Sequence, residues 1–182
     1  MSQVQEKENE CELTEKEQKK IDRLNKQIED TYKKAFFDLL EQKTKAEPPD
    51  YIWIEKLYEE LRNKLTVILK KGSALRVEIE ESMDPQIFSQ MIRNNAFSGE
   101  DTLKLIEYVF ETCKQLGSPA RDTTTDQYKY EVLGLMKAGG TFGDIVPLFF
   151  KNANKSVDNI YNDLQQLSEK FSNKKNDINT KK

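Results

Sequence analysis

The sequence predicts an all-α fold, a compact bundle of about seven or eight helices with disordered ends. Apolar residues recur every three or four positions through most of the chain, which is the period of an amphipathic helix. No run of alternating β-branched residues suggests a strand. A chain of 182 residues is most simply one domain with a real core. We therefore expect a single helical domain over residues 14–172, between a disordered acidic tail at 1–13 and a disordered basic tail at 173–182.

Residues that start and stop helices divide the apolar pattern into segments. The predicted helices span approximately residues 14–42, 50–69, 75–83, 84–93, 98–116, 124–137 and 156–171. Their starts are marked by capping boxes at Thr14–Glu17 and Ser98–Asp101, by Asp50, and by Asp84 before Pro85. Their ends are marked by Pro48-Pro49, Gly72, Asn94-Asn95 and Gly117. A sustained coiled coil is not expected, because prolines and glycines interrupt every heptad run.

The segment between the last two helices is the least regular part of the pattern. Gly139-Gly140 predicts a flexible break. Residues 141–150 are short and apolar, and Pro147 is expected to disturb any helix there. The final helix is then predicted only from about Ser156 to Phe171, followed by a polar tail.

Composition excludes several classes of enzyme. The sequence contains no histidine, which rules out Ser-His-Asp and Cys-His catalysis, HExxH zinc sites and Glu-x-x-His di-iron sites. A site built from carboxylates and a divalent cation is the one enzymatic alternative that remains, and no ligand spacing supports it. We therefore predict a non-enzymatic protein without a cofactor or metal.

Charge and cysteine content point to a soluble intracellular protein. The net charge is −3, so no global field would attract nucleic acid or a membrane. Cys11 and Cys113 lack metal-site spacing and are interpreted as free thiols in a reducing compartment. The N-terminus has no secretory pattern, and no apolar run approaches the length of a membrane span. These features predict a cytoplasmic location.

Several motifs between residues 65 and 122 occur in a distinctive order. Leucines end a helix at Leu65–Leu69, and the segment Leu75-Arg76-Val77-Glu78-Ile79 follows. An aspartate-led helix comes next at Met83-Asp84, and a further helix closes on Cys113 before Pro119-Ala120-Arg121-Asp122. In this order the chain resembles a short member of the T-complex protein 11 family over about residues 20–135.

The resemblance implies a helical domain associated with signalling, linked in that family to cAMP and protein kinase A pathways and to sperm function. The family's usual chains are much longer, mainly at the C-terminal end, and the resemblance implies no catalytic residues. The function predicted on this basis is a protein-interaction or regulatory module with a partner of unknown identity.

Four residues are candidates for partner binding. Arg121 and Asp122 lie in the turn Ser118–Asp122, where a guanidinium could meet a carboxylate or phosphate. The structural alternative is that Asp122 caps the next helix and Arg121 pairs with a neighbouring one. Arg76 is a third candidate, although it can pair with Glu80 one helical turn away.

Trp53 is the fourth candidate, as a hydrophobic anchor among aromatic residues near the first inter-helix turn. The aromatic residues in question are Phe36, Phe37, Tyr51, Trp53 and Tyr58, and a core role is the alternative for all of them.

A second hypothesis assigns the chain to a different class. Lys174, Lys175, Lys181 and Lys182 make the C-terminal tail basic. The excess of lysine over arginine and the frequent asparagines are typical of AT-rich genomes, including those of protists and large DNA viruses. The alternative is therefore a nucleic-acid-associated or virion structural protein that uses this tail, with binding that weakens strongly in salt.

Overall fold

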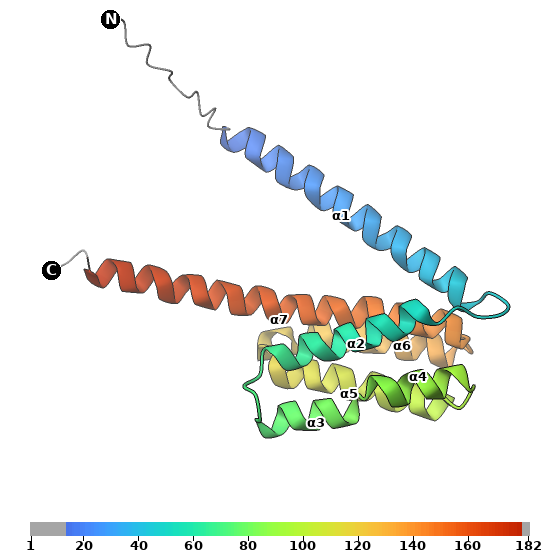
Figure 1. Cartoon of the computed structure of the whole chain (residues 1–182). Helices are drawn as coiled ribbons and strands as arrows, with labels where there is room; N and C mark the ends of the chain where they lie inside the picture. Colours follow the sequence, from blue (N-terminus) through green and yellow to red (C-terminus); the bar gives the residue numbers. More distant parts are fainter. Residues whose placement is uncertain (1–13, 180–182) are drawn as a thin grey trace, which may run out of the picture. The chain divides into compact units, whose positions relative to one another are not determined.

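The structure, a computed structural model, describes residues 14–179, with side chains described to residue 172. Over that range it consists of helices and contains no strand, which confirms the predicted all-α class (Figure 1). The elements are α1 (Glu15–Thr44), α2 (Ile52–Val67), α3 (Ala74–Ser82), α4 (Pro85–Arg93), α5 (Gly99–Leu116), the 3-10 helix η1 (Pro119–Arg121), α6 (Asp122–Lys137) and α7 (Phe142–Asn179). The predicted tail at 1–13 and the last residues of the predicted basic tail, 180–182, lie outside the described residues.

Contacts divide the chain into two compact units, Met1–Asp38 and Leu39–Lys182. The boundary lies inside α1 and inside the range predicted as one domain. The part of α1 in the first unit begins with the predicted capping box, in which the Glu17 carboxylate accepts hydrogen bonds from the Thr14 backbone and hydroxyl at 3.0 and 2.8 Å. The large apolar side chains exposed on this part of α1 are Ile21, Leu24, Ile28 and Tyr32.

The second unit is built around the N-terminal half of α7. Helices α2, α5 and α6 each pack against α7, and α3 and α4 pack against α2 (Figure 1). The buried side chains of α7 are Ile145, Val146, Phe149, Phe150, Asn152, Ala153, Ser156, Val157 and Ile160. The other helices contribute fully buried residues to the same unit, including Ile54, Leu61, Leu65, Ile106, Val109, Phe110 and Val132. Asn152 is polar and fully buried, and its amide nitrogen donates to the Tyr128 carbonyl and the Glu131 carboxylate.

Two helix starts in the second unit, those of α4 and α5, follow the predicted chemistry. The Asp84 carboxylate accepts from the Gln86 and Ile87 backbone amides at 2.8 and 3.2 Å, directly before Pro85. Ser98 and Asp101 form the predicted capping box of α5. These hydrogen bonds satisfy amides that have no partner inside their own helix, so the chain leaves each turn in a fixed direction.

The prediction for residues 141–171 was wrong in one respect. Instead of a disturbed segment and a separate last helix, the structure has one helix, α7, from Phe142 to Asn179. Pro147 lies within its second turn, where a proline removes a single helical hydrogen bond close to the helix start. The same helix passes Phe171, where the sequence predicted its end, and includes residues 173–179 of the predicted tail.

A capping interaction that the sequence analysis overlooked offsets this loss at the start of α7. The Asp144 carboxylate accepts from the Thr141 backbone amide at 2.8 Å and from its hydroxyl at 2.6 Å. It also forms an ion pair with Lys45, in the loop after α1. The hydrogen bond from Lys45, followed by those from Thr141, holds the pKa of Asp144 far below its ordinary value. Thr141 and Asp144 have the spacing of a capping box, so the sequence did contain this signal.

The depressed pKa of Asp144 predicts how the stability of the fold changes with pH. A carboxylate whose pKa is lower in the folded chain stabilises the fold above its unfolded pKa, about 3.9 for aspartate, and that stability is lost as the pH falls through the lower folded pKa. We expect Asp144→Asn to lower the melting temperature near neutral pH, and the difference from the parent chain to shrink in acid. Circular dichroism melts across the acid range measure this. The exposed Glu59→Gln provides the control, and a constant difference at every pH would contradict the assignment.

Candidate interaction site

The turn between α5 and α6 is short and well fixed. Ser118 opens η1, and its hydroxyl accepts a hydrogen bond from the Ala120 amide at 3.4 Å. The Arg121 amide donates to the Ser118 carbonyl at 2.8 Å, which closes the 3-10 turn. The turn therefore holds the Arg121 side chain at a defined place at the start of α6.

Arg121 is paired with α7. Its Nε and one terminal nitrogen donate to the two carboxylate oxygens of Asp163 at 3.1 and 2.8 Å. This forked geometry matches a planar guanidinium to a planar carboxylate. The Arg121 hydrogen bond lowers the pKa of Asp163, and the Asp163 hydrogen bond raises the pKa of Arg121. Arg121 thus pairs with a neighbouring helix, which is the structural alternative stated for it above. Even so, 40% of its side chain stays exposed.

The position of Asp122 differs from the structural alternative, in which its side chain would cap the next helix. It is the first residue of α6 and does not cap the helix with its side chain; Arg121 occupies the N-cap position, without a side-chain cap. One carboxylate oxygen of Asp122 is buried without a hydrogen-bond partner among the described residues. A negative charge in the first turn still interacts favourably with the helix dipole.

Arg76 lies in α3 and makes two interactions. Its Nε donates to Glu80 at 2.8 Å, the predicted pair at one helical turn. A terminal nitrogen donates to the carbonyl of Leu69 at 3.1 Å, beyond the end of α2. Arg76 therefore ties α3 to the segment that precedes it.

Trp53 lies in the first turn of α2 and is 41% exposed. The Lys56 ammonium group lies 4.6 Å from the centre of its ring, in a cation–π contact. Of the other aromatic residues in this group, Tyr58 is buried and stacks on Phe88, whereas Phe36, Phe37 and Tyr51 are half-buried. The four candidate residues thus take different partners, Arg76 beside the end of α2 and Arg121 on α7, and they do not form one cluster.

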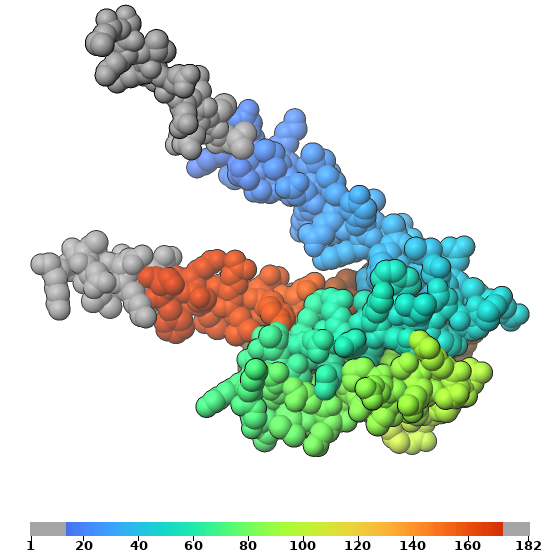
Figure 2. Space-filling model, in the orientation of Figure 1, coloured from blue at the N-terminus to red at the C-terminus, as the bar shows by residue number. Residues whose placement is uncertain are grey.

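The pairing of Arg121 with Asp163 marks the place where α7 leaves the bundle. Nearby, the Tyr161 hydroxyl donates to the Lys64 carbonyl of α2 at 2.9 Å. Ile160 is 4% exposed, whereas the next members of the same apolar stripe, Leu164, Leu167 and Phe171, are 44, 50 and 66% exposed. Figure 2 shows this part of α7 extending beyond α2–α5. We call Leu164, Leu167 and Phe171 the α7 stripe.

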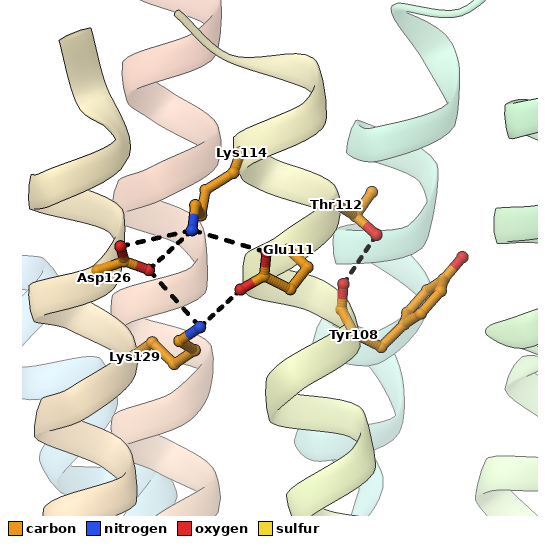
Figure 3. Close-up of polar contacts among 6 residues, drawn as sticks. All are labelled: Tyr108, Glu111, Thr112, Lys114, Asp126 and Lys129. Carbon is orange, nitrogen blue, oxygen red and sulfur yellow. Dashed lines mark hydrogen bonds and ion pairs between the residues drawn. The ribbon is translucent and has the colours of Figure 1, made fainter. Parts of the chain in front are cut away.

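A cluster of four charged side chains joins α5 to α6 (Figure 3). Lys129 of α6 lies 2.6 Å from a carboxylate oxygen of Glu111 and 3.6 Å from Asp126. Lys114 of α5 lies 3.2 Å from Asp126 and 3.6 Å from Glu111. Each cation therefore has two carboxylate neighbours. The sequence shows these residues only as separate charges, because their pairing depends on how α5 and α6 face each other.

Two features are absent from the part of the chain that the structure describes. No group of three or more cysteine, aspartate or glutamate side chains in that part of the chain has an arrangement that could hold a metal ion. None of the described helices is long and apolar enough to cross a membrane.

Comparison with known proteins identifies relatives of the chain. A family model described as T-complex protein 11 matches residues 12–169. The human T-complex protein 11 homolog is 28% identical over 127 residues, which cover 63% of this chain and 25% of the human protein. The chain thus matches about a quarter of the length of that relative. No solved structure matches.

The ion-pair cluster between α5 and α6 predicts a stability effect. Lys129→Met removes the cation nearest to Glu111 and leaves two carboxylates facing Lys114 alone. The Lys129 side chain is mostly buried. We therefore expect the free energy of unfolding to fall by about 1 kcal/mol, which is the upper end of the range of stabilisation by partly exposed ion pairs. Urea denaturation measures the change. Lys104→Met, which breaks an exposed pair with Glu100 within α5, should have no measurable effect; equal losses for both variants would contradict the prediction.

Cys113 is expected to be chemically inert in the folded protein. The side chain is 2% exposed, and burial raises the pKa of its thiol to about 12. Because the thiolate is the reactive form, a thiol reagent should modify Cys113 only after unfolding. The measurement is labelling of a Cys11→Ser variant, so that the signal comes from Cys113 alone, in native buffer and in denaturant. Rapid labelling in native buffer would contradict the burial of this thiol.

Proposed function

The chain belongs to the T-complex protein 11 family, and we propose that it is a non-enzymatic helical module that binds a protein partner through the α7 stripe. The observation that carries the proposal is the change in exposure along a single apolar stripe. Its members up to Ile160 are buried in the bundle, and its members from Leu164 to Phe171 are exposed beyond it. A continuous apolar stripe on a helix is a typical docking surface for another helix or a groove.

The energetic argument concerns the side chains of the stripe. Removing a large aliphatic or aromatic side chain from water contributes about 1.5–3 kcal/mol when burial is complete. Leu164, Leu167 and Phe171 follow each other at spacings of three and four residues, so they lie on one face of α7. A partner that covers this face would bury all three together, which is the arrangement found in the centre of many interfaces.

The candidate residues Arg121 and Asp122 matter to this proposal because they lie beside the start of the α7 stripe. Arg121 pairs with Asp163, one residue before the α7 stripe begins, and so holds the base of the stripe against η1. We propose that Arg121 acts on binding by fixing α7, with the exposed part of its guanidinium available to a carboxylate of the partner. The Asp122 backbone amide donates to the Pro119 carbonyl within the same turn. Trp53 and Arg76 remain proposed partner contacts on α2 and α3.

The regulatory part of the proposal rests on family membership. The resemblance implies a link to cAMP and protein kinase A signalling, and we propose such a link for this chain as well. The chain matches about a quarter of the human homolog. We therefore propose only this general link to signalling and carry over no specific activity of the whole protein. The absence of histidine and the burial of the Cys113 thiol support a role in binding over one in catalysis.

The proposal is tested by a change confined to the α7 stripe. In Leu164→Ser/Leu167→Ser, two exposed apolar side chains become small and polar, and binding should weaken strongly because the buried area is lost. The measurement is quantitative affinity capture from nuclease-treated extract of the native source, followed by binding titration of each captured protein. Circular dichroism checks that the variant keeps its helices.

The matched control lies on the polar side of the same helix. Asn162→Ser/Gln166→Ser changes the same number of residues, both of them exposed and one helical turn apart. We expect the control to bind each partner as the parent chain does. Partners retained equally by both double variants would place the interaction elsewhere and refute this use of α7. Retention only in extract without nuclease treatment would favour the nucleic-acid alternative.

A further inference from the structure

We propose that a groove formed by α3, α4 and α5 binds a basic amphipathic helix of a partner protein. This surface does not include the α7 stripe, so it would be a second, separate binding site. The groove has a volume of about 380 Å³. Its lining, which we call the acidic groove, consists of Tyr58, Glu81, Ser82, Asp84, Ile87, Phe88, Met91, Phe97, Asp101, Lys104, Leu105 and Tyr108.

The floor of the acidic groove is aromatic and rigid. Phe88 stacks on Tyr58 with their ring centres 3.9 Å apart and their planes 5° from parallel. The edge of Phe97 meets Phe88 with ring centres 5.2 Å apart. Both Tyr58 and Phe88 are buried in the core, so the floor is supported from beneath. A preformed apolar floor of this kind accepts an anchor side chain with little loss of conformational freedom.

The apolar surface continues beyond the hollow. Ile87 stands on α4 with 57% of its surface exposed, and Met91 lies one helical turn further along the same face. Tyr108 lines the groove from α5, and its ring points away from the ion-pair cluster (Figure 3). Exposed apolar surface spread along a helix face matches a partner helix, whose apolar side chains recur at the same spacing, better than it matches a compact small molecule.

The charge around the acidic groove selects the partner. Glu81, Asp84 and Asp101 contribute three carboxylates, and Lys104 is the one cation of the lining. The Lys104 ammonium group pairs with Glu100 at 2.7 Å, so a carboxylate outside the lining already offsets its charge. A partner with lysine or arginine beside its apolar residues would meet complementary charge, whereas an acidic partner would be repelled.

Two of these carboxylates are held in place before any partner arrives. Asp84 accepts from the first amides of α4, and Asp101 accepts from the Ser98 backbone and hydroxyl at 2.9 and 2.6 Å. Side chains that cap a helix cannot rotate freely, so their charges stay at the rim of the groove. Glu81 is exposed on α3, which leaves its carboxylate accessible to a basic side chain.

The experiment uses the full chain and a synthetic helical peptide of leucine and lysine, with its leucines at helical spacing. We expect the peptide to bind the parent chain and to bind Glu81→Lys/Ile87→Lys about tenfold more weakly, equivalent to about 1.4 kcal/mol. Both changed residues are exposed, so the variant should keep its melting temperature. Fluorescence anisotropy of the labelled peptide measures the affinity. A second peptide, with glutamate in place of every lysine, should not bind.

The matched control is Glu59→Lys/Val67→Lys, which makes the same two chemical changes at exposed residues of α2 outside the acidic groove. It should bind the basic peptide as the parent chain does. Equal weakening in both double variants, or equal binding of both peptides, would overturn the proposal. The alternative occupant of the groove is a second copy of this chain, and analytical sedimentation of the parent chain tests for it. Self-association that is lost in Glu81→Lys/Ile87→Lys would show that a second copy fills the groove, and this result would also overturn the proposal.

Discussion

The burial of the first half of α7 against α2, α5 and α6 is the interaction on which the rest of the second unit depends. Helix α7 is the element that packs against all three of these helices. The two largest buried side chains of α7, Phe149 and Phe150, are adjacent in sequence, and their ring centres lie 5.0 Å apart. Phe149 meets Phe110 of α5 edge to face, with ring centres 6.2 Å apart. The first half of α7 therefore carries a broad buried face, as expected of a central element of a bundle.

Polar interactions give this core its register. Asn152 is fully buried in α7 and donates to two groups of α6, so sliding α6 along α7 would leave a buried amide without partners. The ion-pair cluster of Lys114, Asp126, Lys129 and Glu111 fixes α5 against α6 in the same way, and the pairing of Arg121 with Asp163 fixes η1 on α7. These contacts are mostly near the surface, so their role is to select one arrangement of helices whose apolar faces supply most of the stability.

The two proposed binding surfaces follow from how the core is closed. Helix α7 is longer than the helices that cover it, so its apolar stripe continues past Ile160 onto a segment where its side chains are 44–66% exposed. Helices α3 and α4 are short and pack on α2, and they meet α5 along a hollow with an aromatic floor and an acidic rim. One surface belongs to a single extended helix and the other to a supported groove, so they suit different partners. A protein that used both surfaces would bring two partners together.

Local chemistry in the sequence determined the helices and most of their boundaries. Asp84 before Pro85, and Ser98 with Asp101, are signals read within four residues, and the structure forms those caps as the sequence predicts. Pro147 misled the prediction because its effect depends on its distance from the helix start, and Thr141 with Asp144 moved that start upstream.

Other features were decided by the tertiary structure alone. Ile160 and Leu164 have the same place in the apolar period, yet one is buried and the other exposed, because the neighbouring helices end between them. The partner of Arg121 lies 42 residues away, and the walls of the acidic groove come from three helices. Periodicity states which face of a helix is apolar, whereas only the packing of distant segments determines whether that face is covered.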